Sequence, residues 1–149
     1  MSKTILLADD DPCVRTMVGR VLETEGYEVV PASSGNEAVA RFLNGPPDLV
    51  LLDLNMPEKD GWEAWHLMNS LHPMVPAIII TARPNQYECA NGLRIDALME
   101  KPLDLHLLLQ TISQLLAESD AERIARVSAP DFTTAWLNGP NNPHGRRTD

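Results

Sequence analysis

Five short apolar segments, separated by longer and more polar stretches, constrain the fold of this chain more than any other feature of its sequence. They are Thr4 to Ala8, Tyr27 to Val30, Leu49 to Leu52, Ala77 to Ile80 and Ala97 to Met99. Each segment is continuously apolar rather than alternating, which is typical of strands buried on both faces of a sheet. Such strands need helices on both sides of their sheet, so we expect strands and helices to alternate along the chain.

The stretches between the predicted strands have the apolar spacing of helices. The expected helices run from about Asp11 to Gly26, Ser34 to Asn44, Gly61 to Leu71, Pro84 to Leu93 and Asp104 to Leu116. Asp11 followed by Pro12 favours a helix start, and Ser34 with Glu37 matches a capping box. The stretch that begins at Pro84 contains asparagine and glycine, which have poor helix propensity, so it should be the most mobile of the set.

Five strands alternating with five helices predict an α/β protein with a parallel sheet, since crossovers between parallel strands of one sheet are right-handed and place helices on its faces. We expect one domain over residues 1–117. Ligands of such sheets bind beyond the carboxyl ends of the strands. The residues that follow each apolar segment are therefore the first place to look for chemistry.

The composition changes from about residue 118. Residues 120–127 have a helical pattern and are able to prolong the last predicted helix, but prolines, glycines and asparagines follow from Pro130 onwards. We therefore expect residues 118–149 to form a C-terminal tail that is partly helical and then disordered.

Two aromatic residues stand out in this tail. Phe132 and Trp136 are spaced i and i+4 behind Asp131, which suits a short helix that docks on a partner. The alternatives are that they belong to the linker of a longer protein or that they contact their own domain.

The charge of the chain opposes binding to nucleic acid and to anionic membranes. It has 12 Lys and Arg residues against 21 Asp and Glu residues, a formal net charge of -9, so we expect neither of these partners. Two cysteines, Cys13 and Cys89, are too few for a disulfide framework, and no segment has the apolar length of a signal peptide or a membrane span. We expect a soluble, cytoplasmic protein.

The residues after the predicted strands are unusually polar. Asp9 and Asp10 follow the first strand, Asp53 the third and Thr81 the fourth, and Lys101 comes shortly after the fifth. Carboxylates that converge at one edge repel one another, so they either hold protons or bind a hard cation. Oxygen ligands without histidine or cysteine favour Mg²⁺, which keeps coordination positions for water and phosphate oxygens.

Four short groups of residues, in this order and at these spacings, carry a specific resemblance. They are Asp9-Asp10, the run from Asp53 to Pro57 followed by Asp60-Gly61, Thr81-Ala82, and Lys101-Pro102. On these groups the chain resembles the receiver domain of bacterial two-component response regulators, over residues 1 to about 116. The resemblance implies a flavodoxin-like, doubly wound sheet of five parallel strands in the order 2-1-3-4-5 with five flanking helices, with residues 1–117 as the receiver domain.

The resemblance implies a function for the polar strand ends. Asp53 is the implied phosphoacceptor, which takes a phosphoryl group from a phosphohistidine on a sensor histidine kinase or a histidine phosphotransfer protein. Lys101 and Thr81 are implied to contact the phosphoryl oxygens. The implied activity is a signalling switch that undergoes its own phosphorylation and slow dephosphorylation, without turnover as an enzyme.

The implied cofactor is Mg²⁺. In the resembling family Asp10 and Asp53 would bind the ion directly, Asn55 would contribute its backbone carbonyl, and Asp9 would act mainly through water. The metal bridges the incoming phosphoryl oxygens and offsets the repulsion between an anionic phosphate and an anionic nucleophile.

The sequence departs from the family pattern at Leu98, where an aromatic residue usually moves inward on activation. The face made by the fourth helix, the fifth strand and the fifth helix is the family's usual interaction surface, and Leu98 is expected on it. The downstream protein target is not identifiable. Arg83, two residues beyond Thr81, either shields the phosphoryl group from water or is a solvated surface arginine.

Two other functions remain open on the sequence alone. A phosphatase of the haloacid dehalogenase type also uses an aspartate nucleophile with Mg²⁺, but it needs a second aspartate two residues later, where this chain has Asn55. The other possibility is an adaptor that keeps the fold and signals without phosphorylation. The set of Asp10, Asp53, Thr81 and Lys101 argues against that adaptor, while Leu98 argues weakly for it.

Overall fold

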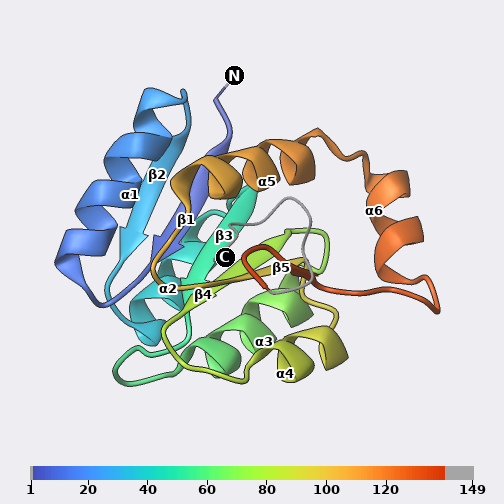
Figure 1. Cartoon of the computed structure of the whole chain (residues 1–149). Coiled ribbons are helices and arrows are strands. Elements are labelled where there is room, and N and C mark those ends of the chain that lie inside the picture. Colours follow the sequence, from blue (N-terminus) through green and yellow to red (C-terminus); the bar gives the residue numbers. More distant parts are fainter. Residues whose placement is uncertain (1, 140–149) are drawn as a thin grey trace.

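The protein is an α/β fold with a central parallel sheet between two layers of helices (Figure 1). The structure, a computed structural model, describes residues 2–139. The strands are β1 (Thr4–Ala8), β2 (Glu28–Ala32), β3 (Leu49–Asp53), β4 (Ala77–Thr81), β5 (Ala97–Glu100) and β6 (Ala135–Trp136). The helices are α1 (Pro12–Thr24), α2 (Gly35–Asn44), α3 (Gly61–Leu71), α4 (Tyr87–Gly92), α5 (Leu105–Ala117) and α6 (Asp120–Val127).

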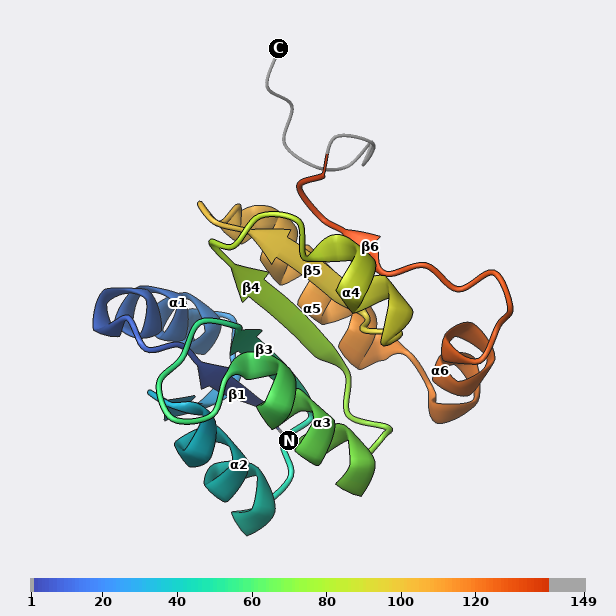
Figure 2. The same ribbon diagram turned by 90° about the horizontal axis from the view of Figure 1, so that it is seen from below.

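The sheet has the order β2-β1-β3-β4-β5-β6, with every pair parallel. The order of the first five strands and the doubly wound, flavodoxin-like arrangement confirm the sequence prediction. Helices α1 and α5 cover one face of the sheet, and α2, α3 and α4 cover the other (Figures 1 and 2). Because both faces are covered, β3 and β4 are buried along their whole length, as their continuous apolar sequences predict.

Side-chain caps fix the starts of the helices that lead away from the strand ends. The Asp11 carboxylate accepts a hydrogen bond from the Cys13 N–H at 2.8 Å, and Asp104 accepts one from Leu107 at 3.1 Å. Both caps were expected from the sequence. Along residues 2–139 no helix combines the length and the apolar character needed to cross a bilayer.

Helix α4 is short and has no side-chain cap. It begins only at Tyr87, and no side chain caps its start at Gln86. Asn85, in the loop before it, has a positive φ of 61°, a conformation that asparagine tolerates better than most residues. The low helix propensity of this stretch thus results in a helix shorter than the one expected from Pro84 to Leu93.

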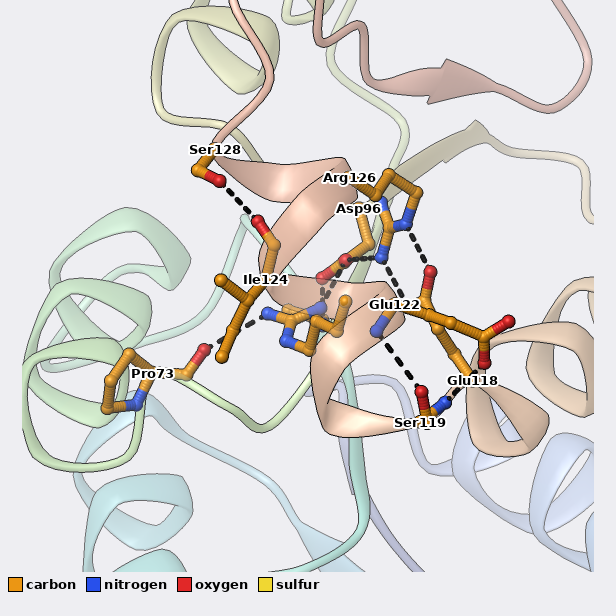
Figure 3. A network of polar contacts seen from close by, with 10 residues as sticks. Pro73, Asp96, Glu118, Ser119, Glu122, Ile124, Arg126 and Ser128 are labelled. Atoms are coloured by element: carbon orange, nitrogen blue, oxygen red, sulfur yellow. Dashed lines mark hydrogen bonds and ion pairs between the residues drawn. The ribbon is translucent and has the colours of Figure 1, made fainter.

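The tail differs from its prediction in two respects. Residues 120–127 form a separate helix, α6, rather than an extension of α5, because Glu118 is extended and Ser119 starts a new capping box with Glu122. Figure 3 shows how α6 is attached to the sheet. The buried Asp96 carboxylate accepts hydrogen bonds from both Arg123 and Arg126 at 2.6 Å.

The expectation that the tail is disordered beyond this helix is wrong for residues 128–139, which we call the strap. The strap crosses the outer edge of the sheet and adds β6 beside β5, so the sheet has six strands and the described chain six helices (Figure 2). It packs in spite of its turn-forming residues because its polar groups find partners. The buried Thr134 hydroxyl donates to the Ile95 carbonyl at 2.6 Å, and the Asn138 amide bonds to the backbone of Glu100. Residues 140–149 lie outside the described residues.

Candidate functional site

The parallel sheet brings carboxylates from two neighbouring strands to one edge. Asp9 and Asp10 follow β1, and Asp53 is the last residue of the adjacent strand β3. One oxygen of each carboxylate lies within 4.8 Å of the others. Asp9 and Asp53 are buried and Asp10 is exposed, so the group is a cluster of negative charge that reaches solvent at Asp10.

Lys101 is the cation of this group. It follows β5, and its Nζ donates to Asp9 Oδ2 at 3.1 Å and to Asp53 Oδ2 at 3.4 Å. Partial burial opposes the charged form of the lysine, but the hydrogen bonds and charges of the two carboxylates outweigh that effect and raise the pKa of Lys101. The ammonium therefore stays charged and joins β5 to β1 and β3 at this edge.

The environment of Asp53 disfavours its own negative charge. Burial, followed in effect by the neighbouring Asp9, raises the pKa of Asp53 from 3.8 to about 6, although the Asn55 N–H and the Lys101 ammonium oppose this rise. The Asn55 N–H donates to Asp53 Oδ1 at 3.2 Å. A single ammonium does not balance three converging carboxylates, and the remaining negative charge fits a divalent, oxygen-preferring cation such as Mg²⁺.

Thr81 lies at the end of β4, next to Asp53 in the sheet. Asp53 is paired with Ile80, so Thr81 is one residue further toward the same edge. Its buried hydroxyl accepts a hydrogen bond from the Arg83 N–H at 2.9 Å, and its carbonyl accepts one from the Lys101 N–H at 2.7 Å. The strand end that holds Thr81 is thus tied both to the loop before α4 and to the residue that contacts Asp53.

Asp60 and Gly61 allow helix α3 to begin close to Asp53. Asp60 caps α3 by accepting from the Glu63 N–H at 3.0 Å. A Cβ atom at residue 61 would lie 2.6 Å from the backbone oxygen of Asp53, so only glycine allows α3 to start this close to the end of β3.

The structure brings the residues expected from the sequence to one edge of the sheet. Asp9, Asp10, Asp53 and Lys101 form the charged group described above, with Asn55 and Thr81 on its border. Arg83 is partly exposed, and its guanidinium donates to Asn55 Oδ1 at 3.4 Å.

Two contacts around the site were missed at the sequence level. The Arg15 guanidinium donates to the backbone carbonyl of Asp9 at 2.6 Å and so holds the end of β1. The Trp62 indole N–H donates to Gln86 at 3.2 Å and links α3 to the residue before α4. The positions of Arg15 and Trp62 beside the motifs are the only sequence signal for these contacts, and it does not specify a partner.

The chain has many relatives among known proteins. The sequence profile of the response regulator receiver domain matches residues 5–131. The response regulator MprA of Mycobacterium bovis is 34% identical over 139 residues, which is 92% of this chain and 60% of MprA. The alkaline phosphatase synthesis transcriptional regulatory protein PhoP of Bacillus subtilis is 31% identical over 122 residues, 80% of this chain and 51% of PhoP. The chain thus spans about half the length of these curated relatives.

Solved structures show the same fold. A CheY-like response regulator receiver domain protein from Methanospirillum hungatei superimposes with a TM-score of 0.74 at 30% identity, covering 78% of this chain and 95% of that one. A putative response regulator from Chloroflexus aurantiacus gives a TM-score of 0.74 at 27% identity, covering 79% and 100%. The fold, the strand-end carboxylates and the profile match together show that the chain belongs to the response regulator receiver domain family.

Proposed function

We propose that this receiver domain is a phosphorylation-activated switch of a two-component phosphorelay, with Asp53 as the phosphoacceptor. The observation that carries the proposal is the position of Lys101, whose ammonium contacts both Asp9 and Asp53 within a group of three converging carboxylates. One ammonium does not neutralise three carboxylates, so the site can also bind a divalent cation. Two cations beside a buried carboxylate would stabilise the negative charge of an incoming phosphoryl group.

The proposed reaction is a substitution at phosphorus. A carboxylate oxygen of Asp53 attacks the phosphorus of a phosphohistidine, the P–N bond breaks, and the imidazole of the donor leaves with the electron pair. Asp9, Asp10, Asp53 and the Asn55 backbone carbonyl are the groups that would hold Mg²⁺. When bound, this ion supplies charge neutralisation for the phosphoryl oxygens.

The chain's own residues stabilise the product. The Lys101 ammonium, which now contacts Asp53, offers a charge-assisted hydrogen bond to a phosphoryl oxygen. The Thr81 hydroxyl, which accepts from Arg83, is free to donate its proton to another phosphoryl oxygen. Catalysis remains limited to the protein's own phosphorylation and slow dephosphorylation.

The proposed partners are proteins. A sensor histidine kinase or a histidine phosphotransfer protein is the donor, and the output is contact with a downstream protein. We propose no nucleic acid partner for these 149 residues, because their net charge of -9 repels phosphate backbones.

The two alternative functions are less well supported. A phosphatase acting on external substrates would need a general acid at residue 55, where the amide side chain of Asn55 accepts a hydrogen bond from Arg83. A phosphorylation-independent adaptor would have no use for the buried charged group of Asp9, Asp53 and Lys101, which is costly to retain.

Incubation with acetyl phosphate and Mg²⁺, followed by intact mass measurement, separates the three functions. The switch predicts a single phosphoryl addition that Asp53→Asn abolishes. Asp48→Asn removes a carboxylate at the opposite end of β3 and should leave the addition unchanged. An unmodified mass would support the adaptor, and rapid multiple turnover of acetyl phosphate would support the phosphatase.

A further inference from the structure

The strap covers the edge of β5 that would otherwise end the sheet. Residue Ala135 lies opposite Ala97, and Trp136 opposite Leu98. The Ala135 N–H donates to the Asp96 carbonyl at 3.1 Å, and the Leu137 N–H donates to the Leu98 carbonyl at 2.9 Å. The strap therefore occupies the edge of β5 and the adjoining side of α4, part of the surface expected to serve for protein contacts (Figure 2).

An aromatic pair connects the strap to α4. The ring of Trp136 stacks on the ring of Tyr87 with centroids 5.0 Å apart and planes at 16°. The Tyr87 hydroxyl donates to the Thr134 carbonyl at 2.8 Å. Tyr87 is the first residue of α4, directly after the loop that begins at Thr81. We therefore expect movement of that loop to disturb the contacts of Tyr87 with Trp136 and Thr134.

A second connection runs along β5 to the charged group. The Asn138 side chain accepts from the Glu100 N–H at 3.0 Å and donates to the Glu100 carbonyl at 2.6 Å. Glu100 directly precedes Lys101, which contacts Asp53. Trp136 and Asn138 of the strap thus contact Tyr87 and Glu100, which lie on the segments that contain Thr81 and Lys101. These two residues are expected to turn toward a phosphoryl group.

The strand of the strap is short but anchored by apolar side chains. β6 has two residues and the Ala135 side chain is exposed, whereas Leu137 is 4% exposed in the core and Trp136 packs against the core. Release of the strap therefore has to withdraw these two side chains, which costs free energy but less than unfolding of the whole domain.

We propose that the strap is a releasable cover of the α4–β5 surface, and that phosphorylation of Asp53 loosens it. The inference rests on the proposed function and adds its output step. When the Thr81 hydroxyl turns to a phosphoryl oxygen, the Arg83 N–H that bonds to it draws the following loop along, and the Tyr87 ring moves from under Trp136. At the same time Lys101 moves toward the phosphoryl group and shifts Glu100 away from Asn138.

Reciprocity follows from this coupling. If phosphorylation weakens the binding of the strap, release of the strap must favour the phosphorylated form by the same free energy.

The strap also explains why residue 98 is a leucine where the family usually has an aromatic residue. Leu98 is fully buried, and Trp136 lies opposite it on the neighbouring strand. The aromatic group beside β5 in this chain is supplied by the strap rather than by residue 98.

Hydrogen exchange of the 149-residue chain, with and without acetyl phosphate and Mg²⁺, tests the proposal. In the phosphorylated chain the amides of peptides covering residues 97–101 and 130–139 should exchange at least about tenfold faster, while those of β3 and β4 stay protected. Asp53→Asn should show no such change. Full phosphorylation with unchanged or slower exchange in these peptides would overturn the strap proposal and leave the proposed function standing. Failure of Asp53 to be phosphorylated would overturn both.

Two variants test the reciprocal effect. Ala135→Pro removes the N–H that bonds to the Asp96 carbonyl and should tighten the equilibrium binding of the phosphoryl analogue beryllofluoride, in the presence of Mg²⁺, several-fold. Ile124→Ala changes an exposed residue of α6 outside the strap and serves as the matched control, with no change in affinity. Circular dichroism confirms that both variants are folded. Equal affinities of a folded Ala135→Pro variant and the control would contradict the coupling.

Discussion

At the scale of single residues, the site is built around a carboxylate that is held where its charge is unfavourable. Asp53 is 2% exposed, and its pKa is raised to about 6 by burial and by Asp9. The folded chain therefore binds the Asp53 proton more tightly than the unfolded chain does. The contribution of this group to the free energy of unfolding is largest below about pH 4 and decreases as the pH rises through about 6.

Replacing Asp53 by asparagine should therefore stabilise the metal-free protein near neutral pH. The difference between a pKa of 3.8 and one of about 6 corresponds to roughly 3 kcal/mol, so we expect Asp53→Asn to gain about 1–3 kcal/mol. Urea denaturation in the presence of a chelator, at several pH values, measures the gain. It should vanish below about pH 4, and Glu25→Gln on the surface should change stability by less than about 0.5 kcal/mol. A destabilised Asp53→Asn near neutral pH would refute this explanation.

Arg83 is expected to protect the phosphorylated site from water. Its guanidinium contacts Asn55 two residues from Asp53, where a long cation covers the approach to an acyl phosphate. Arg83→Ala should shorten the half-life of phosphorylated Asp53 several-fold, as followed by intact mass after removal of the phosphoryl donor. Arg41→Ala, which removes an exposed arginine of α2, is the control. An unchanged half-life in Arg83→Ala would show that this arginine is only a solvated surface residue.

The sequence predicts the residues at the strand ends well, and it predicts their mutual contacts poorly. Asp10, Asp53 and Lys101 were found because parallel strands deliver their last residues to one edge, a consequence of topology alone. The contact between Lys101 and Asp9 depends on side-chain conformations, which no short pattern specifies. The same holds for Arg15, whose bond to a backbone carbonyl leaves no sequence signature.

At the scale of secondary structure elements, caps and apolar segments were sufficient to place the strands and helices of the sheet. They were not sufficient for the tail, because its order comes from long-range polar contacts rather than from local propensity. Helix α6 is attached through Asp96, which precedes β5 and lies far away in the sequence (Figure 3). Pro130, Asn138 and Gly139 of the strap disfavour regular local structure. Its backbone N–H groups nevertheless find hydrogen-bond partners, because β6 pairs with β5.

The Asp96 carboxylate should be essential for attachment of α6. It is 4% exposed and is paired with Arg123 and Arg126, and it also accepts from the Ala77 N–H at 2.9 Å. Asp96→Ala leaves the buried Arg123 uncompensated and should cost about 3–5 kcal/mol in the free energy of unfolding by urea denaturation. The exposed pair of Arg41 and Glu37 provides the comparison, since Arg41→Ala should cost less than about 1 kcal/mol. Similar costs for the two substitutions would show that the Asp96 pairs contribute little.

At the scale of the whole molecule, Mg²⁺ should stabilise the folded chain, because the three carboxylates converge only in that state. At a concentration about 100 times the dissociation constant the gain is about 2.7 kcal/mol. Thermal denaturation in Mg²⁺ and in chelator measures it, and Asp10→Asn should remove most of it. Asp11→Asn keeps a capping side chain outside the carboxylate group and should retain the gain. Equal melting temperatures of the unchanged protein in Mg²⁺ and in chelator would argue against a metal site.

The proposed switch requires that the Asp53 carboxylate, at the edge of the sheet, accepts a phosphoryl group. Peptide mass mapping after reaction with acetyl phosphate, with and without Mg²⁺, measures whether it does. We expect one phosphoryl group, on the peptide that contains Asp53, formed only with Mg²⁺ and released by hydroxylamine as an acyl phosphate must be. A phosphoryl group on a serine, a threonine or another carboxylate, or one that resists hydroxylamine, would contradict it.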